Sequence, residues 1–141
     1  KKKYDFKQIE IIRDYAPDLP EVSCTKTEIE QVLLNLFKNA AQAMAHRPDP
    51  GRRPAITVRT RREEERVRIE VRDNGPGMEE QILSRIFEPF FTTKEPGEGT
   101  GLGLSVSYFI IVTNHGGTIR AESQPGQGAA FLIELPLGGR A

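Results

Sequence analysis

The sequence predicts an α+β fold, a two-layer α/β sandwich in which one mixed, mostly antiparallel sheet carries helices on one face. Three observations favour it. Segments in which apolar and polar residues alternate are joined by short polar or glycine-rich turns, as in hairpins. Other stretches repeat apolar residues every three or four positions, as helices with one buried face do. A chain of 141 residues also suits a single domain with one core, so we expect one domain over residues 1–141.

The first third of the chain predicts a strand, a break and a long helix. Residues 6–14 alternate weakly and predict a strand, the segment 16–20 (APDLP) ends it, and residues 21–24 add a short extended piece. Thr25 and Glu28 fit a capping box, in which the Thr25 hydroxyl meets the Glu28 amide and the Glu28 side chain reaches back. The helix that follows has apolar residues at positions 29, 32, 33, 36, 37, 40 and 44, and prolines at 48, 50 and 54 end it.

The remainder predicts two hairpins and two helices. We expect a first hairpin with strands at 55–62 and 66–73 around a polar tip at 62–65. It is followed by a short helix at 78–86, a long loop at 87–100 and a helix at 102–113 that the NHGG segment at 114–117 ends. The second hairpin has strands at 118–123 and 129–135 around a glycine turn.

Composition narrows the function classes. The 20 Lys and Arg residues balance 20 Asp and Glu residues, so the chain lacks the broad electrostatic attraction that nucleic-acid and anionic-membrane binders use. One Cys and two His provide neither a disulfide framework nor a CxxC or HExxH motif. The apolar runs are too short for a membrane span or a signal peptide. Because the chain starts at Lys1 and not at Met, we expect a piece of a longer protein.

Twelve of the 13 glycines lie in the second half, from Gly75 onward. Such clustering needs a reason, for example positive φ angles or a close approach of the backbone to a ligand. Four glycines alternate through residues 95–104 (EPGEGTGLGL) and lead directly into a predicted helix. Backbone amides at such a position bind anions, and Lys94 and Thr100 add polar donors nearby. A flexible linker is the ordinary alternative, and neither a P-loop nor a Rossmann motif fits this spacing.

A carboxylate ends one of the predicted strands on its core face. Val67, Ile69 and Val71 share this face, and Asp73 continues the row. An ordinary Asx turn is the simpler interpretation, but a solvated turn aspartate need not face the core. We therefore expect Asp73 at the floor of a pocket, where it accepts a hydrogen bond from a ligand amino group while nearby glycines admit the ligand edge.

Two asparagines lie one turn apart on the long predicted helix, Asn35 and Asn39, with Gln31 and Gln42 near the same edge. Asparagine is a mediocre helix former, so the pair needs an explanation. One interpretation is a solvated flank. The other is a row of amide oxygens that can bind a hard cation such as Mg²⁺. The aromatic stretch 87–91 (FEPFF) is similarly either a small satellite core or the hinge of a lid.

In this order, the segments resemble the catalytic ATP-binding domain of sensor histidine kinases, a branch of the superfamily shared with gyrase-type ATPases, mismatch-repair ATPases and heat-shock chaperones. Residues 35–40 (NLFKNA) resemble the N box, 73–77 (DNGPG) and 99–104 (GTGLGL) the two glycine boxes, 87–91 the F box, and 126–128 (GQG) a terminal glycine turn.

The resemblance implies a Bergerat-type fold that holds ATP beneath a lid at about residues 86–100. It implies that Asp73 binds the adenine amino group, that Asn39 coordinates Mg²⁺, and that Lys94 approaches the phosphates, the last two being the catalytic residues. The other nucleotide-binding residues that it implies are Asn35, Gly75, Gly77, Thr100, Gly101, Leu102, Gly103 and Leu104.

One departure separates the branches of this superfamily. ATP-hydrolysing members carry a glutamate at the position of Asn35, where it activates water or a hydroxyl. Without that general base fast hydrolysis is disfavoured, whereas an imidazole nucleophile needs little activation. The resemblance therefore implies phosphoryl transfer to a histidine on a separate dimerisation domain and, through it, to a response regulator. His46 and His115 fit surface or capping roles better than that of the acceptor.

Two alternatives remain open. One is an ATP-hydrolysing conformational clamp of the same superfamily, and the other is a nucleotide-binding regulatory module without transfer activity. We expect ATP and Mg²⁺ as cofactors, no nucleic-acid partner and no direct membrane contact. The expected location is cytoplasmic, within a parent protein that can be membrane-anchored.

Overall fold

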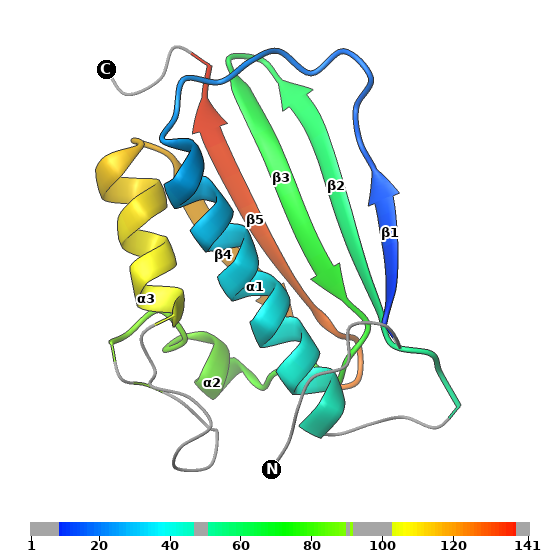
Figure 1. Ribbon diagram of the computed structural model, residues 1–141. Helices are drawn as coiled ribbons and strands as arrows, with labels where there is room; N and C mark the ends of the chain where they lie inside the picture. The colour runs from blue at the N-terminus through cyan, green and yellow to red at the C-terminus, as the bar shows by residue number, and fades with distance from the viewer. Residues whose placement is uncertain (1–8, 47–50, 90, 92–102, 138–141) are drawn as a thin grey trace.

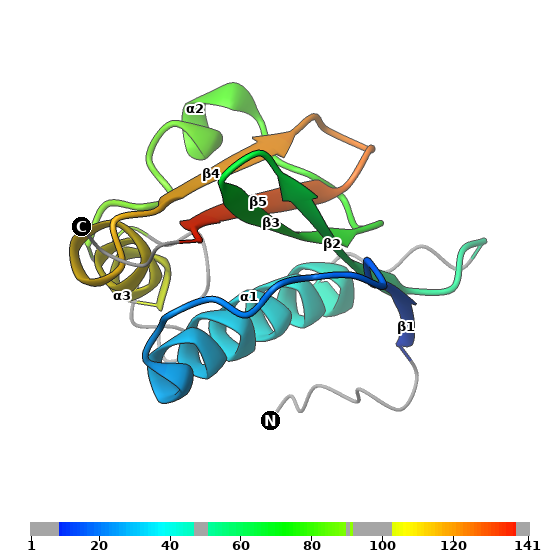
Figure 2. The same cartoon turned by 90° about the horizontal axis from the view of Figure 1, so that it is seen from above.

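The protein folds into one five-stranded sheet with its two longest helical segments on one side (Figures 1 and 2). The computed structural model describes residues 9–46, 51–89, 91 and 103–137. Its strands are β1 (Glu10–Asp14), β2 (Ala55–Glu63), β3 (Arg66–Asp73), β4 (Thr118–Ser123) and β5 (Ala129–Pro136), and its helices are α1 (Lys26–His46), α2 (Glu80–Leu83), α3 (Gly103–Tyr108) and η2 (Phe109–Asn114), the last a π-helical continuation of α3. The predicted two-layer α+β class is confirmed.

The sheet has the strand order β1-β2-β3-β5-β4. Among the described strands only β1 and β2 pair in parallel, which requires the crossover that α1 provides between them. The other neighbours are antiparallel, and β3 lies at the centre between β2 and β5. The predicted polar hairpin tip is confirmed at Glu64, where φ is 57°.

The core lies between the sheet and its helical layer. Alternate residues of the strands face it, as the period of two predicts, and meet the apolar face of α1 and of the α3 and η2 segment. Ile56, Val71, Phe131 and Ile133 from the sheet and Val32, Leu36 and Ile111 from the helices are among its buried members.

The predicted capping box at the start of α1 is wrong. The Thr25 amide donates to Nε2 of His115 at 3.0 Å. The Glu28 carboxylate accepts from Nδ2 of Asn114 at 3.2 and 3.3 Å and does not reach back along its own helix. Tertiary partners therefore replace the local motif, and they join the beginning of α1 to the end of η2.

Several boundaries differ modestly from prediction. The helix expected at 102–113 changes to a π-helix at Phe109, and the short helix expected at 78–86 is limited to Glu80–Leu83. Gly116, with φ 66°, and Gly117 end η2 as predicted, and their amides donate to Val112 and Ile111 carbonyls. Of the first expected strand, residues 6–8 lie outside the described residues.

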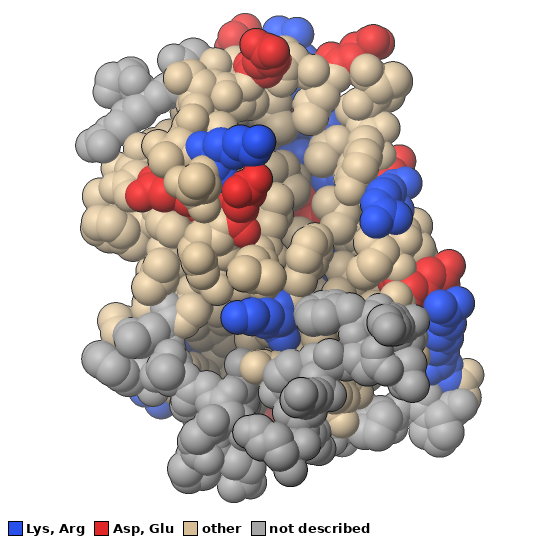
Figure 3. Space-filling view, viewed as in Figure 1, with Lys and Arg blue, Asp and Glu red and all other residues tan. Residues whose placement is uncertain are grey.

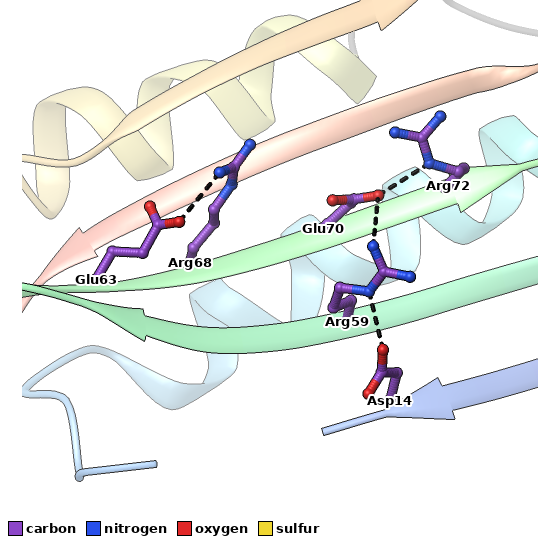
Figure 4. Close-up of polar contacts among 6 residues, drawn as sticks. All are labelled: Asp14, Arg59, Glu63, Arg68, Glu70 and Arg72. Atoms are coloured by element: carbon purple, nitrogen blue, oxygen red, sulfur yellow. Dashed lines mark hydrogen bonds and ion pairs between the residues drawn. The ribbon is translucent and has the colours of Figure 1, made fainter. Parts of the chain in front are cut away.

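Paired charges line the outer face of the sheet (Figure 4). Asp14 of β1 lies 2.9 Å from Arg59 of β2, and Arg59 lies 4.0 Å from Glu70 of β3. Glu70 also contacts Arg72 at 2.9 Å, so this charge ladder crosses three strands. On the opposite face, charges of both signs are interspersed (Figure 3). None of the helices in the described ranges is long and apolar enough to cross a bilayer.

Candidate functional site

Asp73 is a buried carboxylate at the end of the central strand. It is only 7% exposed, and its register partners are Ile56 of β2 and Ala129 of β5. The Gly75 amide donates to Asp73 Oδ1 at 2.8 Å. Burial raises the pKa of Asp73, although the Gly75 and Ala129 amides and the Arg72 guanidinium act to lower it. The predicted inward position is confirmed, and such a desolvated acid at a strand end is characteristic of a functional site.

The turn after Asp73 leaves no room for side chains at its two glycines. A Cβ at Gly75 would lie 3.0 Å from both Asp73 Oδ1 and Met44 Cγ. Gly77 has φ 75°, and a Cβ there would collide with the Gln124 carbonyl. The backbone therefore passes directly over the carboxylate, between β3 and the end of α1.

A second glycine turn, at residues 124–128, is hydrogen-bonded to this first turn and holds it in position. The Gly126 amide donates to the Pro76 carbonyl at 2.6 Å. Ser123 Oγ accepts from the Met78 amide at 2.8 Å and donates to the Gly128 carbonyl at 2.6 Å. The sequence analysis missed this contact. Its signal was that the C-terminal end of one strand and the N-terminal end of its antiparallel neighbour both carry glycine turns.

Asn74 fastens the other side of the turn. Its Oδ1 accepts from the Ala55 amide at 3.0 Å, and its Nδ2 donates to the Arg53 carbonyl at 3.0 Å. Both polar atoms of Asn74 are thus engaged by the segment that leads into β2, and the neighbouring Asp73 is the side chain that faces the core.

Asn39 and Gln42 leave amide groups available along one edge of α1. Both side chains are half-buried, and no described residue hydrogen-bonds to the side chain of Asn39. Oε1 of Gln42 is buried and has no hydrogen-bond partner within the part of the chain that the structure describes. Among the described residues, no group of three His, Cys, Asp or Glu side chains could hold a metal ion. A cation near Asn39 would therefore need ligands of another kind, as Mg²⁺ has when it binds phosphates and water.

Asn35 is placed differently from Asn39. Its Nδ2 donates to the Gly103 carbonyl and to Ser107 Oγ, each at 3.2 Å. Its Oδ1 accepts from Gln31 Nε2 at 3.0 Å. This amide is engaged within the protein and joins α1 to the first turn of α3.

The predicted site residues therefore follow α1 from its middle to its C-terminal end. Gly103 and Leu104 begin α3 near Asn35, and Gly75 lies against Met44 at the far end. Met44 lies nine positions after Asn35 on the helix, which corresponds to a rise of about 13 Å. Lys94, Thr100, Gly101 and Leu102, with most of the expected lid, lie outside the described residues.

The aromatic stretch is anchored to the core at its first residue. The Phe87 ring lies 5.5 Å from the Tyr108 ring of α3 and 6.3 Å from the Phe131 ring of β5, between centroids. The Arg85 guanidinium lies 4.5 Å from the centroid of the Phe91 ring. Phe87 and Phe91 thus pack against the main core, whereas the sequence analysis offered a separate satellite core as one interpretation.

Comparison with known families gives a match over most of the chain. A family model described as histidine kinase-, DNA gyrase B-, and HSP90-like ATPase matches residues 24–139. The two-component sensor PprA of Pseudomonas aeruginosa is 49% identical over 111 residues, which cover 78% of this chain and 12% of PprA. The sensory histidine kinase/phosphatase NtrB of Vibrio alginolyticus is 39% identical over 141 residues, which cover 93% of this chain and 38% of NtrB. The chain thus spans well under half of either relative.

Solved structures give the same picture. The catalytic domain of histidine kinase ThkA superposes with a TM-score of 0.77 at 35% identity, covering 92% of this chain and 81% of that one. Full-length ShkA in complex with AMPPNP superposes with a TM-score of 0.78 at 30% identity, and the match covers 96% of this chain and 27% of the ShkA chain. Histidine kinase ThkA in complex with the response regulator protein TrrA superposes with a TM-score of 0.72 at 32% identity, and the match covers 92% of this chain and 34% of that chain.

Proposed function

This chain belongs to the histidine kinase-, DNA gyrase B-, and HSP90-like ATPase family, as the ATP-binding catalytic domain of a sensor histidine kinase, and from this premise we propose how it uses ATP. It transfers the γ-phosphate to a histidine on a separate dimerisation domain of the same parent protein. The observation that carries the proposal is the buried Asp73 carboxylate beneath the glycine turn, within a chain that matches the family from residue 24 to residue 139.

Asp73 is proposed to select adenine. A buried carboxylate accepts hydrogen bonds, so it can bind the exocyclic amino group of adenine. It would repel the carbonyl oxygen that guanine carries at the same ring position, because both groups are acceptors. Because Gly75 and Gly77 carry no side chain, the turn can lie directly against Asp73 and against the glycine turn at residues 124–128, and Met44 supplies an apolar neighbour. The residues present therefore fit a purine with a donor at this position.

Asn39 is proposed to hold Mg²⁺ together with nucleotide phosphates and water. Its half-buried amide has no described partner, which supports the proposal. When bound, Mg²⁺ neutralises charge on the phosphates. We propose that Lys94 approaches the phosphates and that the backbone from Thr100 to Leu104 binds them beneath a lid at about residues 86–100.

The nucleophile is proposed to come from outside this chain. Position 35 carries an amide that is already hydrogen-bonded, so it supplies no general base for water. Both ring nitrogens of the buried His115 are also engaged, by the Thr25 amide and the Ile110 carbonyl. A histidine on the dimerisation domain, and then a response regulator, would receive the phosphoryl group at the cytoplasmic side.

Binding and transfer can be tested separately. We expect ATP to bind this chain saturably in calorimetry when Mg²⁺ is present. Labelled ATP should transfer its γ-phosphate to a supplied dimerisation domain that carries the histidine, with little free phosphate released. Binding without transfer would favour the regulatory-module alternative. Rapid phosphate release without the acceptor would favour the ATP-hydrolysing clamp.

Asn39→Ala tests the metal assignment. We expect it to weaken binding of ATP with Mg²⁺ by about 10- to 100-fold, as loss of a polar contact to a charged group does. Binding of metal-free ATP, measured in EDTA, should change little. Lys38→Ala is the control, because Lys38 is exposed on the same helix and should leave both affinities unchanged. An equal loss with and without metal would contradict the role of Asn39.

A further inference from the structure

Two polar clamps join α1 to the α3 and η2 segment, and they lie at opposite ends. The near clamp consists of Asn35 on α1 with Gly103 and Ser107 on α3. The far clamp joins Glu28 to Asn114 and the Thr25 amide to His115. Either clamp fixes helix against helix, but of the two only the near one holds Gly103, the first described residue of α3.

The hydrogen bonds of the near clamp permit one orientation of the Asn35 amide. The Gly103 carbonyl can only accept, so Nδ2 and not Oδ1 must face it. Ser107 Oγ donates to that same carbonyl at 3.0 Å, which leaves its lone pairs to accept from Asn35. With Gln31 donating to Oδ1, the amide is engaged on both sides. A network satisfied in this way is rigid and intolerant of change at any member.

We propose that Asn35 is a positioning residue for the phosphate end of the site and not itself a ligand of the nucleotide. The inference rests on the proposed function, because it assigns the phosphates to the backbone up to Leu104 and the metal to Asn39. Asn35 lies one helical turn before Asn39 and bonds directly to Gly103. It therefore sets the separation between the metal ligand and the backbone that binds phosphate.

Ser107 separates this role from direct ligation. It belongs to the same hydrogen-bonded triangle, but its side chain is fully buried at 0% exposure and cannot contact a nucleotide. If Asn35 acts by position, Ser107→Ala should produce a weaker form of the same defect. If Asn35 contacts the nucleotide or its metal, Ser107→Ala should leave binding unaltered.

The experiment measures dissociation constants for ADP with Mg²⁺ and for adenosine, using this chain and calorimetry. We expect Asn35→Ala to weaken ADP binding by about tenfold, because two hydrogen bonds of the clamp are lost, and to leave adenosine binding unchanged. Asn35→Asp should behave like the alanine variant, since its carboxylate cannot donate to Gly103. Ser107→Ala should weaken ADP binding by about threefold and also spare adenosine.

Asn114→Ala is the matched control, because it removes an amide from the far clamp between the same two elements. It should lower thermal stability without changing the ratio of the ADP and adenosine affinities. The double variant Asn35→Ala with Ser107→Ala should bind ADP no worse than Asn35→Ala alone, since both act through one triangle.

Three results would overturn the proposal. Normal ADP binding by Ser107→Ala, beside a defect in Asn35→Ala, would make Asn35 a direct ligand. Equal losses for ADP and adenosine in Asn35→Ala would show a general structural role. Failure of the unaltered chain to bind either compound would contradict the proposed function first, and the positioning role with it.

Discussion

Asp73→Asn is expected to weaken ATP binding by about 100-fold. The carboxylate would be replaced by an amide whose nitrogen cannot accept, so the adenine amino group would lose a charged acceptor in a buried site. Calorimetry with ATP and Mg²⁺ measures the loss. Unchanged affinity would remove Asp73 from the binding site.

The loss of ATP affinity in Asp73→Asn should not be accompanied by a loss of folding stability. Burial raises the pKa of Asp73, so the folded state holds this proton more tightly than the unfolded state does. The contribution of this group to stability is therefore greatest at low pH and is lost as the pH rises through the raised pKa. At neutral pH the ionised group is a cost, and Asp73→Asn should unfold at the same temperature or a higher one.

Glu70→Gln is the control for this variant. Glu70 is the other buried acid of β3, but it lies on the outer face, where it contacts Arg72 and Arg59. Its replacement should lower stability, since it removes the carboxylate that contacts Arg72 and one of the two carboxylates beside Arg59, and should leave ATP affinity unchanged. Asp73→Asn should thus weaken ATP binding without lowering stability, whereas Glu70→Gln should lower stability without weakening ATP binding.

Gly77→Ala is expected to destabilise the domain by at least about 3 kcal/mol, a sum of left-handed backbone strain and forced displacement of packed atoms. The new Cβ would collide with the Gln124 carbonyl and lie 3.1 Å from the Gly128 carbonyl. For a domain of this size the melting temperature should fall by roughly 10 °C. Thermal unfolding followed by circular dichroism measures it.

Gly126→Ala separates strain from collision. Gly126 has a similar φ of 80°, but an added Cβ there would meet no atom within 4 Å. We expect a loss of only about 1–2 kcal/mol, from backbone strain alone. Equal losses in the two variants would mean that the contact between the two turns contributes nothing beyond conformational strain.

The buried face of the sheet could be predicted because it depends on local periodicity. Alternation through Val67, Ile69 and Val71 places Asp73 on the core side without any knowledge of what lies opposite, since successive side chains of a strand must alternate. The glycines at 116 and 117 likewise end a helix for reasons contained in a few residues. Such features need no long-range information.

The incorrect capping box at the start of α1 involves partners distant in sequence. Thr25 and Glu28 have the local form of a capping box, but His115 and Asn114 compete for the same groups from about 90 residues away. The nucleotide-binding role that the family resemblance implies for Asn35 stays a prediction, but the carbonyl and hydroxyl partners of Asn35 on α3 could not be inferred from its own helix. The π-helix at Phe109 similarly has no signal in the apolar pattern.

The charge ladder on the outer face makes the two edges of the sheet unequal in their resistance to opening. At the β1 edge, Asp14 and Arg59 are both exposed, so salt screens their attraction and little else covers the strand. At the β4 edge, the Ser123 hydroxyl forms uncharged hydrogen bonds with the backbone of Met78 and Gly128, next to the two glycine turns. Fraying under heat or high ionic strength should therefore begin at β1, and the Asp73 end of β3, where it pairs with β5, should be among the last parts to open.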